Sequence, residues 1–375
     1  MKYCTLCLQP DTRPNTVFTK DGLCPACHYY EQSKAIDWQE RYEILLDLIR
    51  SIKRPSGQFF DCIVGVSGGK DSTRQALWVR DNLGLKPLLV CLSQPPQQIN
   101  QLGVDNISNL IEMGFDVAIL SPAPETWRQL MRESFFKFSN WARSTELTLF
   151  GTVPRLAIKY QIPLIFWGEN PALQVGDMNT MGSNGYDGNN LRHSNTLSSG
   201  HTWMLEAGYK HHQILPYVYP SSEEFDAANI QIIYLGWFMG DWGLVQNASY
   251  SCPVGLHIRA AHPKETGDLY GLSNLDEDWH NMNQMVKYLK FGFGKVTEYV
   301  NEELRMGLMN RSTAIDLVEQ YDGKCADSYI DSFCEFMKIT QREFWTHVHS
   351  AMNRDLFKID SAGSIRRRFK VGVGF

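Results

Sequence analysis

The chain has 375 residues, of which 43% are hydrophobic and 21% are charged, an ordinary balance for a globular protein of two domains or one large domain with appendages. A formal net charge of −5 argues against a chain-wide positive field of the kind that attracts nucleic acid, so we expect no nucleic-acid partner. The longest apolar run is shorter than the roughly 20 residues of a membrane span, and the amino end lacks the apolar core of a secretory signal, so we expect a cytoplasmic protein without membrane insertion.

The first predicted module covers residues 1–35 and contains two Cys-x-x-Cys pairs. Their separation falls in the range of zinc knuckles, so we expect Cys4, Cys7, Cys24 and Cys27 to hold one tetrahedral Zn²⁺ in a closed, structural site. An iron–sulfur cluster accepts the same four thiolates and stays an alternative. His28, next to Cys27, is a less favoured substitute for one thiol.

A helix is predicted after Asp37, which can cap it, and Pro55-Ser56-Gly57 ends it. Short apolar runs then alternate with helical patterns. The predicted strands are 61–66, 87–92, 116–120 and 163–168, and the predicted helices between them are 71–83, 101–113, 125–138 and 151–160. This alternation predicts a Rossmann-like α/β domain over residues 36–270, with a parallel sheet covered on both faces.

Two further regions have a different character. Residues 174–200 are rich in Gly, Asn and Ser and follow a strand, so we expect a long loop that acts as a lid over the site. Residues 271–375 show helical patterns and no clear strand, which predicts a helical C-terminal subdomain.

The stretch IVGVSGGKDST at 63–73 carries the most specific chemical signal. It is not a Walker A loop, because Gly65 is one residue too close to Gly69-Lys70 and Asp71 stands where the hydroxyl belongs. A strand, a glycine turn and a helix start still form a phosphate cradle, in which Gly68 and Gly69 let backbone amides approach an anion. Ser67 and Ser72 add hydroxyl donors, and Asp71 beside a polyphosphate implies Mg²⁺ between them.

Glu169 and Asn170 follow the strand at 163–168, where α/β proteins place ligand-binding groups, although a helix cap or turn explains them equally well. Asp241 is a candidate for substrate contact or for a satisfied buried carboxylate. Arg155, Arg259 and Lys264 are weaker candidates for contact with an acidic substrate.

The run Ser67-Gly68-Gly69-Lys70-Asp71-Ser72 resembles the SGGxDS signature of the PP-loop ATP pyrophosphatases, the fold also called the adenine nucleotide alpha hydrolase type. The resemblance implies that these six residues bind the β- and γ-phosphates of ATP. It also implies that a substrate oxygen is adenylated and that pyrophosphate is released.

MKYCTLCLQPDTRPNTVF, DGLCPAC, WGEN at 167–170, IIYLGWF and the run LKFGFGKVTEYVNEELRMGLMNRSTAIDLVEQYDG resemble the N-acetyl sugar amidotransferases of the WbpG and PseA type. This second resemblance implies a role in bacterial lipopolysaccharide (O-antigen) or flagellin-glycan synthesis, in which an acetamido group becomes acetamidino. ATP would adenylate the amide oxygen, and ammonia would then displace AMP. We expect catalytic roles for Lys70, Asp71 and Glu169, and nucleotide binding by Ser67, Gly68, Gly69, Lys70, Asp71, Ser72 and Asn170.

The ammonia must be borrowed, because the sequence shows neither an N-terminal nucleophile nor a G-x-C-x-G turn of a glutaminase. The family resemblance implies a glutaminase subunit and a cyclase-like ammonia-channel subunit, both like those of imidazole-glycerol-phosphate synthase. The main alternative is a tRNA-thiolating PP-loop enzyme. Two observations disfavour it: the chain is acidic, and the cysteines outside the first module form no further Cys-x-x-Cys pair. A non-enzymatic nucleotide-binding scaffold is disfavoured by the intact Ser67, Asp71 and Ser72.

Overall fold

The computed structural model describes residues 1–53, 55–194, 197 and 200–374. Its centre is a five-stranded sheet in the order β3-β2-β1-β4-β5, and every neighbouring pair is parallel. The strands are β1 Cys62–Val66, β2 Pro87–Leu92, β3 Val117–Leu120, β4 Leu164–Trp167 and β5 Gln231–Tyr234. Among the described residues, none of the helices has both the length and the apolar character that crossing a bilayer requires.

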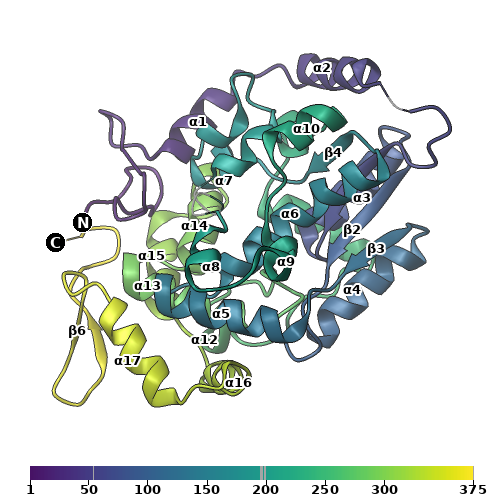
Figure 1. Ribbon diagram of the computed structural model, residues 1–375. Coiled ribbons are helices and arrows are strands. Elements are labelled where there is room, and N and C mark those ends of the chain that lie inside the picture. Colours follow the sequence, from purple (N-terminus) through teal and green to yellow (C-terminus); the bar gives the residue numbers. More distant parts are fainter. Residues whose placement is uncertain (54, 195–196, 198–199, 375) are drawn as a thin grey trace.

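Helices cover both faces of this sheet (Figure 1). The first face packs against α2 Trp38–Ser51, α3 Lys70–Asp81 and α4 Gln101–Glu112, and the second against α6 Ala142–Tyr160 and α10 Ser222–Ala228. Burial on two faces explains why the strand sequences are almost continuously apolar. The predicted fold class, a Rossmann-like parallel sheet, is confirmed.

The four predicted strands and the helices between them are present, with ends shifted by a few residues. The helix predicted at 151–160 is longer, because α6 begins at Ala142. β5 was missed as a strand, because its apolar run continues without a break into the 3₁₀ turn Leu235–Phe238 and reads as undivided buried packing.

The predicted lid at 174–200 is only partly described, since residues 195, 196, 198 and 199 lie outside the described residues. Its described part contains the 3₁₀ turns Asn179–Met181 and Gly188–His193, and it follows α7 Pro171–Val175. Asn189 ties it to β5, because its side chain accepts a hydrogen bond from Ile232 N and donates one to Ile230 O. A lid function stays a prediction.

The chain beyond β5 is mainly helical, as predicted, but it also contains a hairpin of β6 Phe357–Ile359 and β7 Ile365–Arg367 that the sequence did not suggest. The basic run at 366–368 lies in and just after β7. The helices of this region, and the short ones that precede it, are α8 Thr202–Glu206, α9 His211–Ile214, α11 Leu244–Ser251, α12 Pro263–Thr266, α13 Trp279–Phe291, α14 Lys295–Met306, α15 Arg311–Tyr321, α16 Asp327–Met337 and α17 Gln341–Ala351.

The cysteine module, which includes α1 Pro25–Ser33, packs on the C-terminal helices, and Tyr29 of α1 also packs with Ala172 of α7 and Tyr234 of β5 (Figure 1). Leu8 N donates to Asn301 Oδ1 at 2.7 Å, and Arg311 donates to Cys7 O at 2.7 Å. The two ends of the chain meet in this region, where Gly374 lies against Met1 O. Buried residues of 1–35 and of 271–375 belong to one hydrophobic cluster, which also includes residues of the predicted α/β domain, and the predicted domain boundaries stay a prediction.

Candidate functional site

The phosphate-binding loop predicted from the sequence follows β1 directly and leads into α3. Gly68 has a φ of +76°, and a Cβ there would lie 3.0 Å from Asn106 Cβ, so a side chain would be both strained and crowded. Ser72 Oγ donates to Gly69 O at 3.1 Å and closes the turn. Among the described residues, no side chain caps the amino end of α3 at Gly69, which leaves its first-turn amides for an anion.

Lys70 and Asp71 are held in place by α11, a helix that the sequence analysis did not connect with the loop. Lys70 Nζ lies 2.7 Å from Asp71 Oδ2, and Asn247 Nδ2 donates to Asp71 Oδ1 at 2.6 Å. Ser251 Oγ donates to Lys70 O at 2.8 Å. The carboxylate of Asp71 is thus oriented from two sides before any ligand binds.

Arg74 supports this arrangement from one turn further along α3. Its guanidinium donates to Asn247 Oδ1 at 2.8 Å and to Asp241 Oδ2 at 2.7 Å, while the Arg74 side chain is only 4% exposed. Asp241, a candidate for substrate contact, is therefore paired with Arg74 on the protein surface rather than buried. Arg74 and Asn247 are site residues that no motif in the sequence marked.

Glu169 follows β4, the strand next to β1, and the structure brings it near Asp71. Burial and the charge of Asp71 raise the pKa of Glu169 to about 7, against a smaller lowering by Lys70. Two carboxylates near each other at a phosphate loop repel unless a cation lies between them. The pair therefore fits Mg²⁺, which Asp71 and Glu169 would hold through their carboxylate oxygens and which would neutralise phosphate charge there.

Asn170, predicted to contact the nucleotide, has its polar atoms engaged with the backbone. Its Oδ1 accepts from Leu173 N at 3.2 Å as the cap of α7, and its Nδ2 donates to Gly236 O at 3.3 Å. The structure thus gives Asn170 the cap role that the sequence also allowed. Nucleotide contact by Asn170 stays a prediction.

The C-terminal helix α14 lies beside α11, and two of its residues that the sequence analysis did not single out, Tyr299 and Glu302, are affected by the charges at the phosphate loop. Glu302 accepts a hydrogen bond from Leu244 N at the start of α11. Burial raises the pKa of Glu302, while the hydrogen bond from Leu244 N and the charges of Arg305 and Lys70 lower it and the charge of Asp71 raises it. Burial also raises the pKa of Tyr299, with the charges of Asp268 and Asp71 adding to it. Both residues lie within the run at 289–323 on which the family resemblance rests, and that was the available signal.

The four cysteines of the first module form the metal-binding cluster that the sequence predicts. Their Sγ atoms all lie within 4.8 Å of one another in a buried position, and Cys7 Sγ is 3.7 Å from Cys24 Sγ. A tetrahedral site with Zn–S bonds of about 2.3 Å has sulfur atoms about 3.8 Å apart, so the cluster fits Zn²⁺. His28 is exposed and contacts Gln32, outside the cluster.

Two of the other basic candidates, Arg155 and Arg259, are engaged with the protein itself, and the third, Lys264, is exposed on α12. Arg155 donates to Val218 O. Arg259 donates to Ser273 O, Glu277 O and the carboxylate of Asp278. Neither contact places a free guanidinium at the phosphate loop.

One family model matches the chain: residues 270–370 match the model described as LPS biosynthesis protein WbpG-like, C-terminal domain. The C-terminal part of the chain is thus WbpG-like, and the resemblance to the WbpG-type N-acetyl sugar amidotransferases is confirmed there. None of the curated proteins matches the chain.

Three solved structures are distantly similar. A predicted subunit of tRNA methyltransferase from Methanocaldococcus jannaschii is 16% identical over 52% of this chain and 75% of its own, with a TM-score of 0.28. NMN synthetase from Francisella tularensis is 16% identical over 52% of this chain and 93% of its own, with a TM-score of 0.28. The U34-tRNA thiolase NcsA from Methanococcus maripaludis, with its [4Fe-4S] cluster, is 12% identical over 90% of this chain and 96% of its own, with a TM-score of 0.25.

Proposed function

We propose that the protein is an ATP-dependent amidotransferase that converts the acetamido group of a sugar to an acetamidino group in bacterial surface-glycan synthesis. One observation supports the proposal: α14, inside the WbpG-like segment, bonds through Glu302 to Leu244 N at the start of α11, and α11 in turn bonds to Lys70 and Asp71. The part of the chain that resembles sugar-modifying enzymes thus contacts the helix that supports the phosphate loop.

The proposed reaction divides a difficult substitution into two steps. The acetamido oxygen attacks the α-phosphorus of ATP, which releases pyrophosphate and leaves an O-adenylyl imidate. Ammonia then adds to the imidate carbon and loses a proton, and the C–O bond breaks with departure of AMP. Activation is needed because an amide oxygen is a poor leaving group.

Each part of the site has a task in this scheme. The amides after Gly68 and Gly69 and the hydroxyl of Ser67 hold the departing pyrophosphate, while the hydroxyl of Ser72 keeps the turn closed. Mg²⁺ at Asp71 and Glu169 would neutralise charge on the phosphates. Lys70, held by its ion pair with Asp71, supplies a positive charge beside the phosphates.

Ammonia is proposed to come from a separate glutaminase subunit through a cyclase-like channel subunit, and the protein to act in the cytoplasm. The proposed source of ammonia rests on the family resemblance.

The test is to incubate the protein with ATP, Mg²⁺, ammonium and a panel of acetamido sugars, free and nucleotide-linked, and to follow AMP, pyrophosphate and the sugar mass. We expect sugar-dependent formation of AMP and replacement of one oxygen by nitrogen in the product. Asp71→Asn should lower the rate at least 100-fold, because the ligand for Mg²⁺ is lost, whereas the exposed Asp226→Asn should not. Sugar-independent formation of ADP would contradict the proposal.

A further inference from the structure

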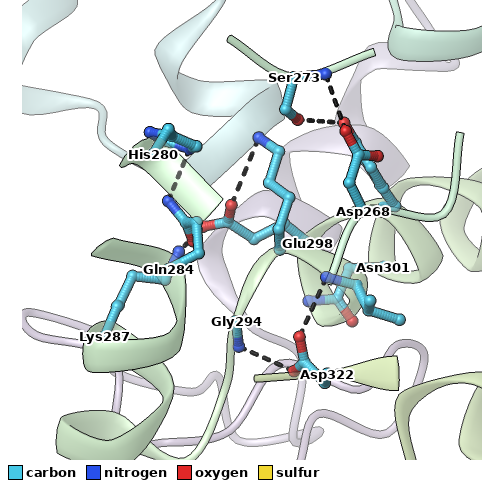
Figure 2. A network of polar contacts seen from close by, with 12 residues as sticks. Asp268, Ser273, His280, Gln284, Lys287, Gly294, Glu298, Asn301 and Asp322 are labelled. Carbon is cyan, nitrogen blue, oxygen red and sulfur yellow. Dashed lines mark hydrogen bonds and ion pairs between the residues drawn. The ribbon is translucent and has the colours of Figure 1, made fainter. Parts of the chain in front are cut away.

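A cluster of basic side chains lies where α13, α14 and the cysteine module meet. Its centre is Glu298, whose carboxylate is 2.7 Å from Arg13 Nη2, 2.9 Å from Lys287 Nζ and 3.6 Å from Lys295 Nζ. Figure 2 shows Lys287 and Glu298 turned towards each other, with Gln284 and His280 beside them. Three cations share this single carboxylate, so the cluster carries surplus positive charge.

The surrounding groups offset only part of that surplus. The carboxylate of Asp322 accepts hydrogen bonds from Gly294 N at 2.7 Å and Val296 N at 3.0 Å and also interacts with the charge of Lys287, which leaves three cations for two carboxylates. His280 stays neutral, because burial and the charges of Lys295 and Lys287 hold its pKa well below its ordinary value. Partly buried cations without matching anions are costly, which favours a bound anion as their partner.

Lys295 is the most weakly paired of the three cations. Its ammonium group lies 3.6 Å from the Glu298 carboxylate and 5.1 Å from the centre of the Tyr299 ring, but no hydrogen bond links its three donors to another of the residues that the structure describes. The side chains of Lys295, Lys287 and Glu298 are 25%, 24% and 22% exposed, so solvent and a ligand can reach them.

The position of the cluster relates it to the phosphate loop. Lys295, Tyr299 and Glu302 are spaced i, i+4 and i+7, so they share one face of α14. Seven residues of helix correspond to about 10 Å. At one end of this face Glu302 accepts from Leu244 N at the start of α11, the helix whose Asn247 donates to Asp71, and at the other end is Lys295. That separation suits a sugar whose acetamido group meets ATP while its acidic substituent lies further along the helix.

We infer that Arg13, Lys287 and Lys295 form a binding site for an oxyanion of the sugar substrate, either a phosphate or a carboxylate group. The inference rests on the proposed function for the identity of the ligand as a sugar. Charge-assisted hydrogen bonds from lysine and arginine are the usual means of holding such groups.

The experiment measures binding by calorimetry without ATP or ammonia, so that it does not depend on turnover. The probes are UDP-N-acetylglucosamine, N-acetylneuraminic acid and uncharged N-acetylglucosamine, which share the acetamido group and differ in the anion. We expect one of the two charged sugars to bind at least tenfold more tightly than the neutral one, which identifies the anion as phosphate or carboxylate. Equal binding of all three would overturn the inference.

The variants are Lys295→Gln and, as a matched control, Lys358→Gln at an exposed position on β6. Lys295→Gln should weaken binding of the charged sugar about tenfold and leave the weaker binding of N-acetylglucosamine unchanged, whereas Lys358→Gln should change neither. Unaltered binding of the charged sugar by a folded Lys295→Gln protein would refute the site. Thermal melting and metal content of each variant establish that it is folded.

The two proposals fail in different ways. If the protein binds a charged sugar through Lys295 but forms no AMP, the inferred anion site is supported and the proposed amidotransferase reaction is contradicted. If wild type and Lys295→Gln both make the acetamidino product with the same KM for the sugar, the proposed reaction is supported and the inferred anion site is contradicted.

Discussion

Glu169 and Asp71 follow neighbouring parallel strands, and their carboxyl groups interact electrostatically at the phosphate loop. Neither β4 nor β1 alone explains the raised pKa of Glu169, which comes from burial and from the nearness of Asp71. A carboxyl group whose pKa rises from 4.5 to about 7 on folding destabilises the ionised folded state. Such a cost is typical of a site built for a charged ligand.

The sign of the pH dependence follows from this shift. Between pH 4.5 and about 7 the folded protein binds more protons at Glu169 than the unfolded chain does, so the free energy of unfolding falls as pH rises through this range. In buffer without Mg²⁺, Glu169→Gln should therefore be more stable than wild type by about 1–3 kcal/mol at pH 8, with little difference at pH 4.5. Guanidinium unfolding at the two pH values measures this.

The control for this prediction is Glu112→Gln, an exposed site on α4, which should change stability equally little at both pH values. Added Mg²⁺ should narrow the gap at pH 8, because a cation between Asp71 and Glu169 stabilises the wild-type pair only. A stability difference that does not vary with pH would show that Glu169 titrates normally.

At the scale of an element, α14 is the helix on which both proposals depend. Its amino end is fixed by Asp322, the residue at the carboxyl end of α15. Asp322 ends α15, as its place before Gly323 suggests, but its carboxylate also accepts from Gly294 N, Val296 N and Thr297 Oγ1. The side chain is buried, so these three hydrogen bonds replace water completely. Asp322 therefore positions the start of α14.

We expect Asp322→Ala to lower the free energy of unfolding by about 2–4 kcal/mol, because it leaves buried donors without partners. The matched control is Asn310→Ala, which removes an exposed cap from α15 and should cost about 1 kcal/mol. Chemical unfolding of both variants measures the difference. If Asp322→Ala costs no more than Asn310→Ala, the interhelical cap does not stabilise α14.

Local sequence patterns predict only part of the candidate site. The strands β1 to β4 and the turn at Gly68 follow from local patterns, because buried parallel strands and phosphate turns have characteristic compositions. Asn247, Glu302 and Arg74 could not be found this way, since their roles depend on which helices pack beside the loop. Asp322 shows the same limit: its turn is local, but its partners at 294–297 are set by tertiary packing.

At the scale of the whole molecule, the cysteine module and the C-terminal helices form one body. Leu8 and Cys7 bond to α14 and α15, Thr12 bonds to Phe291 O, and the buried Arg305 lies near enough to the cysteines for their charge to act on it. Arg305 is also close to Glu302, which borders the phosphate loop. A metal ion bound by the four cysteines would thus stabilise the helix that completes the site.

Loss of that metal should therefore lower the local stability of segments outside residues 1–35. In Cys4→Ser we expect less than one zinc per chain, a loss of about 2–5 kcal/mol in stability and faster amide exchange in α14 and α15, with β1 and α3 still protected. Metal analysis distinguishes zinc from iron, and hydrogen-exchange mass spectrometry locates the loosened segments. Cys252→Ser, which changes an exposed cysteine outside the cluster, is the control and should affect neither. Faster exchange confined to residues 1–35 would mean that the module is bound to the C-terminal helices without supporting them.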